Sequence, residues 1–295
     1  MKPAPFVYHR PATVEEAVQT LAAVRETGKV LAGGQSLVPL MSMRLASPAH
    51  LVDINHLAGL AHVRVAGGEV YVGALARHAD VEQHEAAYDA VPLLRQALRH
   101  VAHPTIRNRG TTVGSLVHAD PAGEMPAVLL LLDGRVRLRS ASGEREVAAG
   151  EFFRGPMESA VRPDELALGA VFRAPARGSG TAFRELARRH GDYAMCGAGA
   201  VVTTDPDGAV TRARLGLVST GPTPVLVDVT AAVTGSGGGF VADRVHELVT
   251  GVIEPEADIH ATAEYRAHLA RTLALQVLEE ARDRAVGRHG GERVA

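Results

Sequence analysis

The alternation of apolar and polar residues along the chain predicts short helices and short strands in close succession. Apolar residues recur at helical spacing over 13–26, where Thr13 and Glu16 form a capping-box pair and Gly28 ends the helix. A strand is predicted at 29–32, a helix at 37–45 and a second strand at 50–54. The N-terminal quarter is therefore expected to be a small unit of strands and helices.

From residue 58 the apolar pattern alternates between hairpins and helices. Gly67 and Gly68 separate two apolar runs and predict a hairpin with strands at 61–65 and 69–72. Further elements are expected as helices at 79–88, 92–100 and 126–132, a hairpin of strands 135–140 and 144–147, and a strand at 163–175. The stretch 103–123, rich in Gly, Thr, Pro and His, is predicted to be irregular.

A Pro- and Gly-containing linker at 175–180 marks the expected domain boundary. Beyond it the pattern predicts strands at 181–188, 198–204, 210–218 and 224–227, a helix at 240–248 and a long helix at 261–286. Tyr265, Leu269, Leu273, Val277 and Leu278 are expected to share one face of that last helix.

Strands and helices mix without strict alternation, which predicts an α+β fold. We expect a first domain at 1–176, divided into subdomains of about 1–57 and 58–176. A second domain is expected at 177–286 and a flexible tail at 287–295.

Composition excludes several classes of protein. Hydrophobic residues make up 46% of the 295 residues and charged residues 22%, as in ordinary globular proteins. The single cysteine excludes a disulfide framework and a cysteine-ligated iron–sulfur cluster. A net charge of -2 gives no basic field for nucleic acid. The longest apolar run, 127–132, is too short to span a membrane, and no signal-peptide pattern is present, so we expect a cytoplasmic location.

The first candidate site is the glycine loop Ala32–Leu37, with the sequence AGGQSL. A strand ends, two glycines allow a turn, and a helix begins, so free backbone amides favour an anion such as phosphate. Gln35 and Ser36 add side-chain donors. The loop is neither a Walker motif nor the dinucleotide fingerprint, and a plain strand-to-helix turn remains an alternative.

A second glycine loop lies at 109–115, and its segment 111–115 reads TTVGS. Downstream, Asp120 and Glu124 are candidates to accept hydrogen bonds from ribose hydroxyls, and Asp120 is equally suited to starting an Asx turn. A loop without a ligand is again the alternative. Together, the two glycine loops are suited to holding two parts of one long ligand.

Other catalytic arrangements find little support. There is no nucleophile elbow and no His-Glu-x-x-His zinc motif, and the 14 histidines follow no metal-ligand spacing. Cys196 lies in an apolar strand start, where a cysteine is usually a small buried hydrophobic residue. We therefore expect no catalytic acid–base pair and no metal site in this chain.

Three ordered motifs are similar to those of one known family. They are AGGQSLVPLM at 32–41, TTVGS at 111–115 continuing into HADPAGEMP at 118–126, and RRHGDYA at 188–194. This set resembles the FAD-binding (medium) subunit of the molybdenum hydroxylases, which include the carbon monoxide dehydrogenase medium subunit and the flavin domain of xanthine dehydrogenase. The resemblance runs from about residue 3 to 285.

The resemblance implies a two-part FAD-binding domain like that of vanillyl-alcohol oxidase, followed by a smaller sheet-and-helix domain. It implies non-covalent FAD, with the pyrophosphate wrapped by backbone amides of the first loop and the diphosphate and flavin region contacted by the second. Glu124 stands where relatives usually carry aspartate, and Tyr193 would lie near the isoalloxazine ring. The implied cofactor contacts are Ala32, Gly33, Gly34, Gln35, Ser36, Leu37, Thr111, Thr112, Val113, Gly114, Ser115, Glu124 and Tyr193.

Two departures from the family pattern bear on these roles. Val113 occupies a position where relatives often have glycine, and we expect an ordinary β-region φ there, because valine is strained at positive φ. A lysine that several relatives carry before the arginine pair is absent, and Arg184 or Arg188 is a candidate to replace its charge.

The function implied is electron transfer through FAD, which carries the redox chemistry. Molybdenum cofactor and iron–sulfur clusters are expected only on partner chains, a large and a small subunit, in a dimer of heterotrimers. The resemblance does not decide whether NAD, a quinone or oxygen accepts the electrons, and it does not identify the substrate of the complex. The alternatives are a stand-alone FAD-dependent oxidase of the same broader fold and a non-catalytic binding module. Apolar surface for partners is expected at 37–45 and on the terminal helix.

Overall fold

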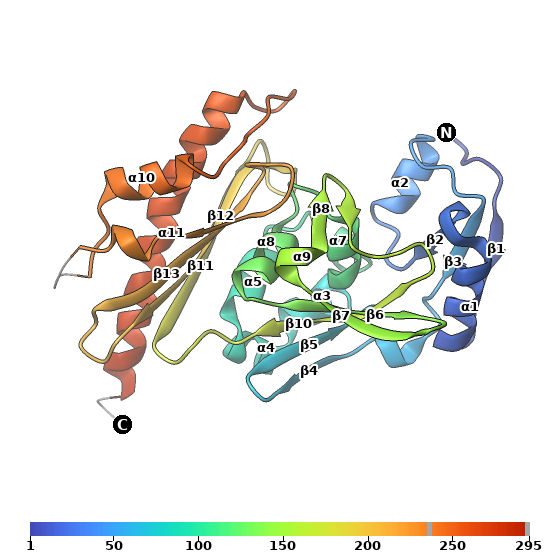
Figure 1. The fold of residues 1–295 in the computed structure, drawn as a ribbon, viewed down its shortest axis with the longest axis horizontal. Coiled ribbons are helices and arrows are strands. Elements are labelled where there is room, and N and C mark those ends of the chain that lie inside the picture. Colours follow the sequence, from blue (N-terminus) through green and yellow to red (C-terminus); the bar gives the residue numbers. More distant parts are fainter. Residues whose placement is uncertain (235–237, 293–295) are drawn as a thin grey trace.

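A computed structural model describes residues 1–234 and 238–292 of the chain. Figure 1 shows an N-terminal unit at one end of the molecule, a central region, and a C-terminal sheet backed by two helices at the other end. Mixed helix and sheet was predicted and is confirmed.

The N-terminal unit is a parallel three-stranded sheet in the order β1-β3-β2. It contains β1 (Val7–His9), α1 (Val14–Val24), η1 (Arg25–Thr27), β2 (Gly28–Leu31), α2 (Leu37–Ser42) and β3 (His50–Asp53). Thr13 caps α1, accepting a hydrogen bond from the Glu16 amide at 3.1 Å, as the sequence predicted. The first glycine loop follows β2 at the carboxyl edge of this sheet, where ligands commonly bind.

The central region contains an antiparallel sheet in the order β4-β5-β10-β6-β7. Its strands are β4 (Val63–Ala66), β5 (Glu69–Gly73), β6 (Arg135–Ser140), β7 (Gly143–Ala148) and β10 (Leu166–Arg173). Helical elements are η2 (Ala58–Leu60), α3 (His78–Gln83), α4 (Glu85–Ala90), α5 (Pro92–Leu98), α6 (Pro104–Arg107), α7 (Thr112–His118), α8 (Glu124–Leu131) and α9 (Ala149–Phe152). A small hairpin joins β8 (Phe153–Gly155) to β9 (Glu158–Ser159).

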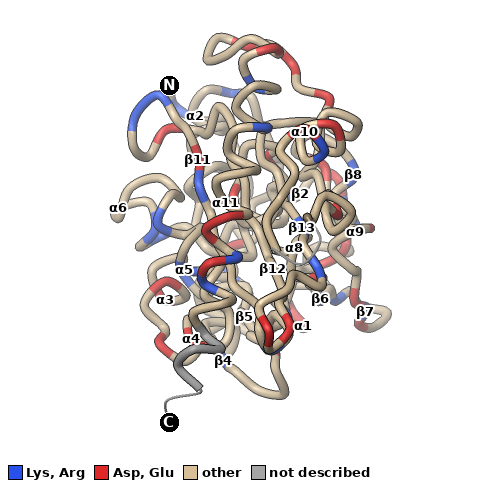
Figure 2. Tube along the Cα trace, turned by 90° about the vertical axis from the view of Figure 1, so that its left-hand side faces the viewer, with Lys and Arg blue, Asp and Glu red and all other residues tan. Residues whose placement is uncertain are grey.

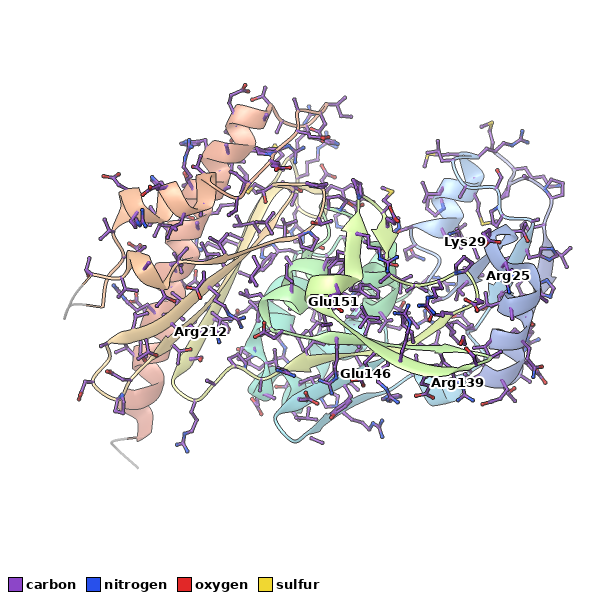
Figure 3. The ribbon with its side chains drawn as sticks, viewed as in Figure 1. Arg25, Lys29, Arg139, Glu146, Glu151 and Arg212 are labelled. Atoms are coloured by element: carbon purple, nitrogen blue, oxygen red, sulfur yellow. The ribbon has the colours of Figure 1, made fainter. Side chains whose placement is uncertain are left out.

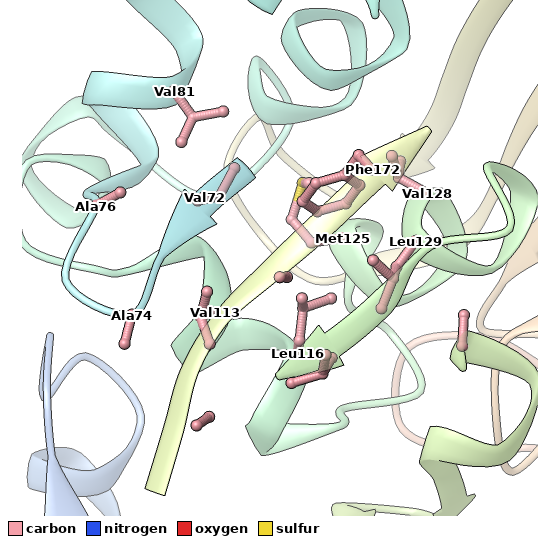
Figure 4. Close-up of a cluster of buried hydrophobic side chains, with 14 of the residues drawn as sticks. Val72, Ala74, Ala76, Val81, Val113, Leu116, Met125, Val128, Leu129 and Phe172 are labelled. Carbon is pink, nitrogen blue, oxygen red and sulfur yellow. The ribbon is translucent and has the colours of Figure 1, made fainter. Parts of the chain in front are cut away.

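The main hydrophobic core lies between this sheet and helices α5, α7 and α8. Val72 of β5, Phe172 of β10, Leu116 of α7 and Met125 of α8 are all almost completely buried and pack together (Figure 4). The core therefore fixes α7 and α8, and with them the second glycine loop and Glu124.

Ion pairs cross the central sheet on its more exposed side. Arg135 of β6 contacts Glu69 of β5 at 2.6 Å and Glu146 of β7 at 2.8 Å. Arg139 reaches Glu15 of α1 at 2.6 Å, and Figure 3 shows Arg139 and Glu146 along the β6–β7 hairpin. The pairs that Arg135 and Arg139 form with Glu146 and Glu15 are exposed at the glutamate, and exposed pairs contribute about 1 kcal/mol or less, so they supplement the core.

The C-terminal region is an antiparallel sheet in the order β11-β12-β13-β14. Its elements are β11 (Ser179–Ala187), β12 (Ala194–Thr204), β13 (Val210–Val218), β14 (Val225–Asp228), η3 (Thr230–Ala232), α10 (Ala242–Thr250) and α11 (Ala263–Glu292). Figure 2 shows positive and negative residues interspersed along α11.

The two faces of this sheet enter different cores. Ala182, Ala198 and Leu215 pack with residues of α11, whereas Phe183 and Val218 join the main core of the central region. Helix α8 lies close to the face of the sheet that carries Phe183 and Val218. The approach is possible because Gly216 of β13 has no side chain: a Cβ there would lie 3.1 Å from the backbone oxygen of Ala127 in α8. The C-terminal region is thus packed directly against the helix that begins at Glu124.

Several predicted elements need correction. The stretch 103–123 contains α6 and α7 and is not irregular throughout, because Pro104 and Thr111 begin short helices that are stabilised by packing. The predicted helix at 79–88 is two helices that meet at His84, whose ring caps the second by accepting from the Ala87 amide.

Tyr265 does not belong to the buried face of α11, since it is 43% exposed. Helix α11 continues beyond 286 to Glu292, and the end of the predicted tail, 293–295, lies outside the described residues.

Candidate functional site

The two glycine loops are in direct backbone contact. A Cβ built on Gly33 would lie 2.5 Å from the carbonyl oxygen of Arg109, 2.7 Å from the Cα of Gly110 and 3.0 Å from the amide nitrogen of Thr111. No side chain fits at Gly33 without moving one of these backbones. Segments that are far apart in sequence therefore form one structural unit.

The first loop presents a row of unused donors. Gly34 has a φ of +71°, which glycine adopts without strain, and Gln35 donates from Nε2 to the Gly33 carbonyl at 3.1 Å. Among the hydrogen bonds of the described residues, none has the amide of residues 33–37 as its donor. The hydroxyl of Ser36 does not cap α2. Successive amides of this kind form an anion-binding concavity.

The second loop is a helix start whose side chains are largely committed to the protein. Thr111 caps α7 by accepting from the Gly114 amide at 3.1 Å. Thr112 is fully buried, with its amide bonded to the Ala76 carbonyl and its hydroxyl 3.2 Å from His78 Nδ1. Gly114 and Ser115 are partly exposed. The surface of this loop is therefore provided by Gly114 and Ser115, while Thr111 and Thr112 hold the turn.

Val113 is helical and 2% exposed, in the main core (Figure 4). The absence of a positive φ agrees with our expectation, but the predicted β-region conformation is wrong. The reason is that Thr111 is the N-cap, so Val113 already lies in the first turn of α7.

Asn55 and Arg77, which the sequence analysis did not identify, join the two loops. Asn55 donates from Nδ2 to the Ala32 carbonyl at 2.8 Å, and Arg77 donates to Asn55 Oδ1 at 2.8 Å. Arg77 also donates to the Arg109 carbonyl at 2.6 Å. We call this pair the interloop clamp. The signal that the sequence offered was that Asn55 comes next after the strand predicted at 50–54; the structure pairs this strand in parallel with the one preceding the first loop.

Asp53 holds the clamp in place. Its Oδ1 accepts from Asn55 Nδ2 at 2.6 Å, and its Oδ2 accepts from the Tyr8 hydroxyl at 2.6 Å. Burial opposes ionisation, but these hydrogen bonds outweigh it and lower the pKa of Asp53. An ionised Asp53 thus anchors the polar network beneath the first loop.

Glu124 begins α8 and is 9% exposed. Burial, together with the nearby charge of Asp120, raises its pKa to about 7. Asp120 accepts a hydrogen bond from the Ala122 amide at 2.9 Å and so starts an Asx turn. This was one of the two roles expected for Asp120. The Ser219 amide donates to the Pro121 carbonyl at 2.9 Å, which fixes this loop to the C-terminal sheet.

Tyr193 lies in the connection between β11 and β12 and is 63% exposed. Partial burial, followed by the charges of Asp120 and Glu124, raises its pKa. The fold therefore brings Tyr193 into the electrostatic environment of Glu124, with ring surface available for stacking.

The remaining candidates offer no chemistry of their own. Burial raises the pKa of the Cys196 thiol to about 12, so it is protonated and poorly nucleophilic at neutral pH. Within the described ranges, no group of three or more His, Cys, Asp or Glu side chains is arranged to hold a metal ion. Likewise, none of the helices in residues 1–234 and 238–292 has the length and apolar character needed to cross a membrane.

Comparison with family models covers nearly all of the chain. Residues 4–172 match the FAD binding domain in molybdopterin dehydrogenase, and residues 181–281 match the CO dehydrogenase flavoprotein C-terminal domain. The chain belongs to the FAD-binding (medium) subunit family of the molybdenum hydroxylases. It is accordingly an FAD-dependent oxidoreductase subunit, and the resemblance found in the sequence is confirmed.

Individual relatives align along the whole chain. The alpha subunit of the 6-hydroxypseudooxynicotine dehydrogenase complex of Paenarthrobacter nicotinovorans is 40% identical over 97% of both chains. The carbon monoxide dehydrogenase medium chain of Afipia carboxidovorans is 33% identical, covering 97% of this chain and 99% of the relative. The structure of carbon monoxide dehydrogenase from Hydrogenophaga pseudoflava superposes with a TM-score of 0.91 at 32% identity, over 96% of this chain and 99% of that one.

The residues present fit FAD. The glycine cradle at Gly33, the unused amides of residues 33–37 and the exposed ring of Tyr193 supply a phosphate-binding turn and an aromatic surface. The predictions of FAD as cofactor and of an oxidoreductase subunit are confirmed by the family.

Proposed function

We propose that this chain binds FAD non-covalently between its two glycine loops and its C-terminal region, and relays electrons within a molybdenum hydroxylase complex. Electrons would arrive from an iron–sulfur small subunit and leave toward NAD, a quinone or another acceptor. The observation that carries the proposal is the backbone contact of Gly33 with Arg109 and Gly110, beside amides for which the described part of the chain provides no acceptor.

Each part of the site has a proposed role. The amides of Gly33, Gly34, Gln35, Ser36 and Leu37 bind the pyrophosphate, while the Ala32 carbonyl is held by Asn55. Gly114 and Ser115 approach the diphosphate and flavin region, with Thr111, Thr112 and Val113 fixing the helix start behind them. Glu124 accepts from a ribose or adenine-side donor, and Tyr193 shields a face of the isoalloxazine ring. Bound FAD supplies the redox chemistry, and the chain supplies binding and electrostatics.

The region 37–45 is proposed to contact a partner subunit. Val38, Met43 and Leu45 are 45%, 54% and 73% exposed, which is unusual for large apolar side chains so close together. The partners proposed are a molybdenum-binding large subunit and an iron–sulfur small subunit, in a dimer of heterotrimers. The relatives with nicotine-derived and carbon monoxide substrates support assembly into such complexes.

Reconstitution with FAD tests the binding half of the proposal. Purified protein titrated with FAD is expected to quench flavin fluorescence, and acid precipitation should release the flavin into the supernatant. A protein that binds no flavin would overturn the proposal. Flavin retained in the acid pellet would instead favour a tethered, stand-alone oxidase.

Co-expression with the candidate partner genes tests the electron-transfer half. A stable complex containing molybdenum and iron–sulfur clusters, in which substrate reduces the flavin, is expected. An active monomer that oxidises its own substrate would favour the stand-alone oxidase. A folded chain with neither flavin nor partners would favour the non-catalytic module.

A further inference from the structure

The connection between β11 and β12, residues 188–193, carries Tyr193 and has little support of its own. We call these six residues the tyrosine loop. Tyr193 is 63% exposed, so packing of its ring alone does not fix its position. Among the described residues, the hydrogen bonds of the tyrosine loop are limited to one inside it, from the Asp192 amide to the Arg189 carbonyl at 3.1 Å. The position of Tyr193 therefore depends on contacts at the end and in the middle of the loop.

Ser219 holds the end of the tyrosine loop. This serine directly follows β13, is 8% exposed, and donates from its hydroxyl to the Ala194 carbonyl at 2.7 Å. Its amide donates to the Pro121 carbonyl at 2.9 Å, in the segment that leads into α8. Ser219 thus joins the residue after Tyr193 to the segment before Glu124.

Ser219 adopts a backbone conformation that serine rarely takes. Its φ is +58°, in the left-handed region, where residues other than glycine are disfavoured. Arg266 of α11 provides a third contact, because it donates to the Ser219 carbonyl at 3.4 Å and to the Met195 carbonyl at 2.9 Å. Arg266 is itself 7% exposed and is paired with Asp258 at 2.6 Å. A strained backbone persists where its surroundings fix it on several sides, and such places are frequent at functional sites.

A second contact holds the middle of the tyrosine loop. Gly191 has a φ of +86° and lies against the imidazole of His103, so that a Cβ on Gly191 would be 2.5 Å from Cε1 and 2.8 Å from each ring nitrogen. The His190 ring meets the same imidazole edge-on, at 6.1 Å between ring centroids. His103 is the N-cap of α6, the helix that leads to the second glycine loop. Gly191 therefore seats the tyrosine loop directly on the central region.

We propose that Ser219 and Gly191 are positioning residues that hold Tyr193 over the flavin. The hydroxyl of Ser219 fixes the end of the tyrosine loop, and the missing side chain of Gly191 lets its middle approach the imidazole of His103. This inference rests on the proposed function, since it takes Tyr193 as the residue that shields the isoalloxazine ring. Its consequence is that the hydroxyl of Ser219 affects FAD binding through Tyr193 and not directly.

A tryptophan at position 193 reports on the loop without any cofactor. The chain contains no tryptophan, so Tyr193→Trp gives a single emitter in the full-length protein. Adding Ser219→Ala is expected to lower the fluorescence anisotropy and to increase quenching by acrylamide, because the end of the loop is released. Ser142→Ala, at an exposed serine of the β6–β7 turn, is the matched control and should change neither quantity. Unchanged anisotropy after Ser219→Ala would overturn the proposal.

The same tryptophan protein tests the contact at Gly191. Gly191→Ala brings a Cβ into the His103 ring and is also expected to lower the anisotropy. Gly68→Ala is the matched control, because its φ of +75° imposes a similar backbone strain, but a Cβ there meets nothing within 4 Å. Equal anisotropy in these two variants would overturn the role proposed for Gly191.

A double-mutant cycle on FAD affinity separates positioning from a purely structural role. Tyr193→Ala removes the stacking surface and should weaken FAD binding by roughly three- to tenfold in a fluorescence titration. Ser219→Ala should weaken binding by no more than this, and the double variant should bind like Tyr193→Ala alone, because the serine acts through the tyrosine.

The cycle has two contrary outcomes. Losses that simply add would overturn the proposal, as would a Tyr193→Ala protein that binds FAD like the wild type. Absence of FAD binding by the wild type would instead overturn the proposed function, while the tryptophan measurement would still decide whether Ser219 holds the loop.

Ser219→Gly keeps the proposal testable if Ser219→Ala does not fold. Glycine adopts a positive φ without strain, so this variant should have a higher urea midpoint than Ser219→Ala. Both variants lack the hydroxyl, so they should show the same lowered anisotropy in the Tyr193→Trp protein and the same weakened FAD binding. Wild-type anisotropy and affinity in Ser219→Gly would overturn the proposal, because the hydroxyl would then be dispensable.

Discussion

In the first glycine loop the amides of residues 33–37 have no acceptor among residues 1–234 and 238–292, whereas in the second loop Thr112 and Val113 are turned into the protein interior. Both loops combine glycine with small polar residues before a short helix. The difference arises because the second loop is followed by a helix that packs in the main core, while α2 after the first loop remains largely at the surface. Loops of similar composition thus differ in structure: the first presents free amides at the surface, and the second packs two of its residues into the interior.

The largest effect is expected at the contact between the loops. Gly33→Ala places a Cβ 2.5 Å from the Arg109 carbonyl oxygen, so the backbones must separate and the row of amides is distorted. Such overpacking costs roughly 1–3 kcal/mol, and we expect FAD affinity to fall by at least about tenfold in a fluorescence titration. Gly59→Ala is the matched control, because a Cβ there meets nothing within 4 Å. Equal affinities for the two variants would show that the contact is unimportant for binding.

The next effect is expected at the interloop clamp. Arg77→Met keeps much of the aliphatic side chain but removes the donors to Asn55 and to the Arg109 carbonyl. An unsatisfied acceptor costs about 1–3 kcal/mol, so FAD affinity should drop by roughly tenfold, with a lower melting temperature. Arg64→Met, at an exposed position on β4, should change neither quantity. If Arg77→Met bound FAD like the wild type, the loops would hold their geometry without the clamp.

A smaller effect, on stability more than on binding, is expected in the second loop. Thr112→Val removes the hydroxyl near His78 while keeping the shape of the side chain. We expect a loss of about 1–2 kcal/mol in the free energy of unfolding, measured by urea denaturation, with FAD affinity nearly unchanged. A variant of normal stability that binds FAD poorly would mean that Thr112 contacts the cofactor directly.

The smallest effect is expected at Ser36. Its hydroxyl does not cap α2, so Ser36→Ala removes at most one hydrogen bond to bound FAD and leaves the amides in place. Affinity should fall by less than about tenfold, with an unchanged urea midpoint. A loss larger than that of Gly33→Ala would show that side chains, and not the backbone, dominate binding by the first loop.

Local residue patterns gave the first loop and Glu124 as candidates, and the family resemblance added Tyr193. The structure brings the two glycine loops together, as expected. The stretch 103–123, which contains the second loop, was predicted to be irregular because it is rich in Gly, Thr, Pro and His. Helix α7 within this stretch is stabilised by the burial of Val113 and Leu116, which is a tertiary effect.

The sequence analysis did not identify Asn55 and Arg77 for a related reason. Each is an ordinary polar residue in an ordinary local sequence, and its role depends on groups from other segments. Arg77 donates to the Arg109 carbonyl and to Asn55, and Asn55 donates to the Ala32 carbonyl. No local pattern encodes such partners.

The sequence by itself determined the mixed fold, the two glycine turns and the membership in an FAD-binding family, because these depend on residue types at short fixed spacings. Only the tertiary structure decided which loop leaves its amides free and which polar side chains join the two loops. Hydrogen-bond partners and desolvation are properties of the packed chain, since both depend on segments that are distant in sequence and close in space.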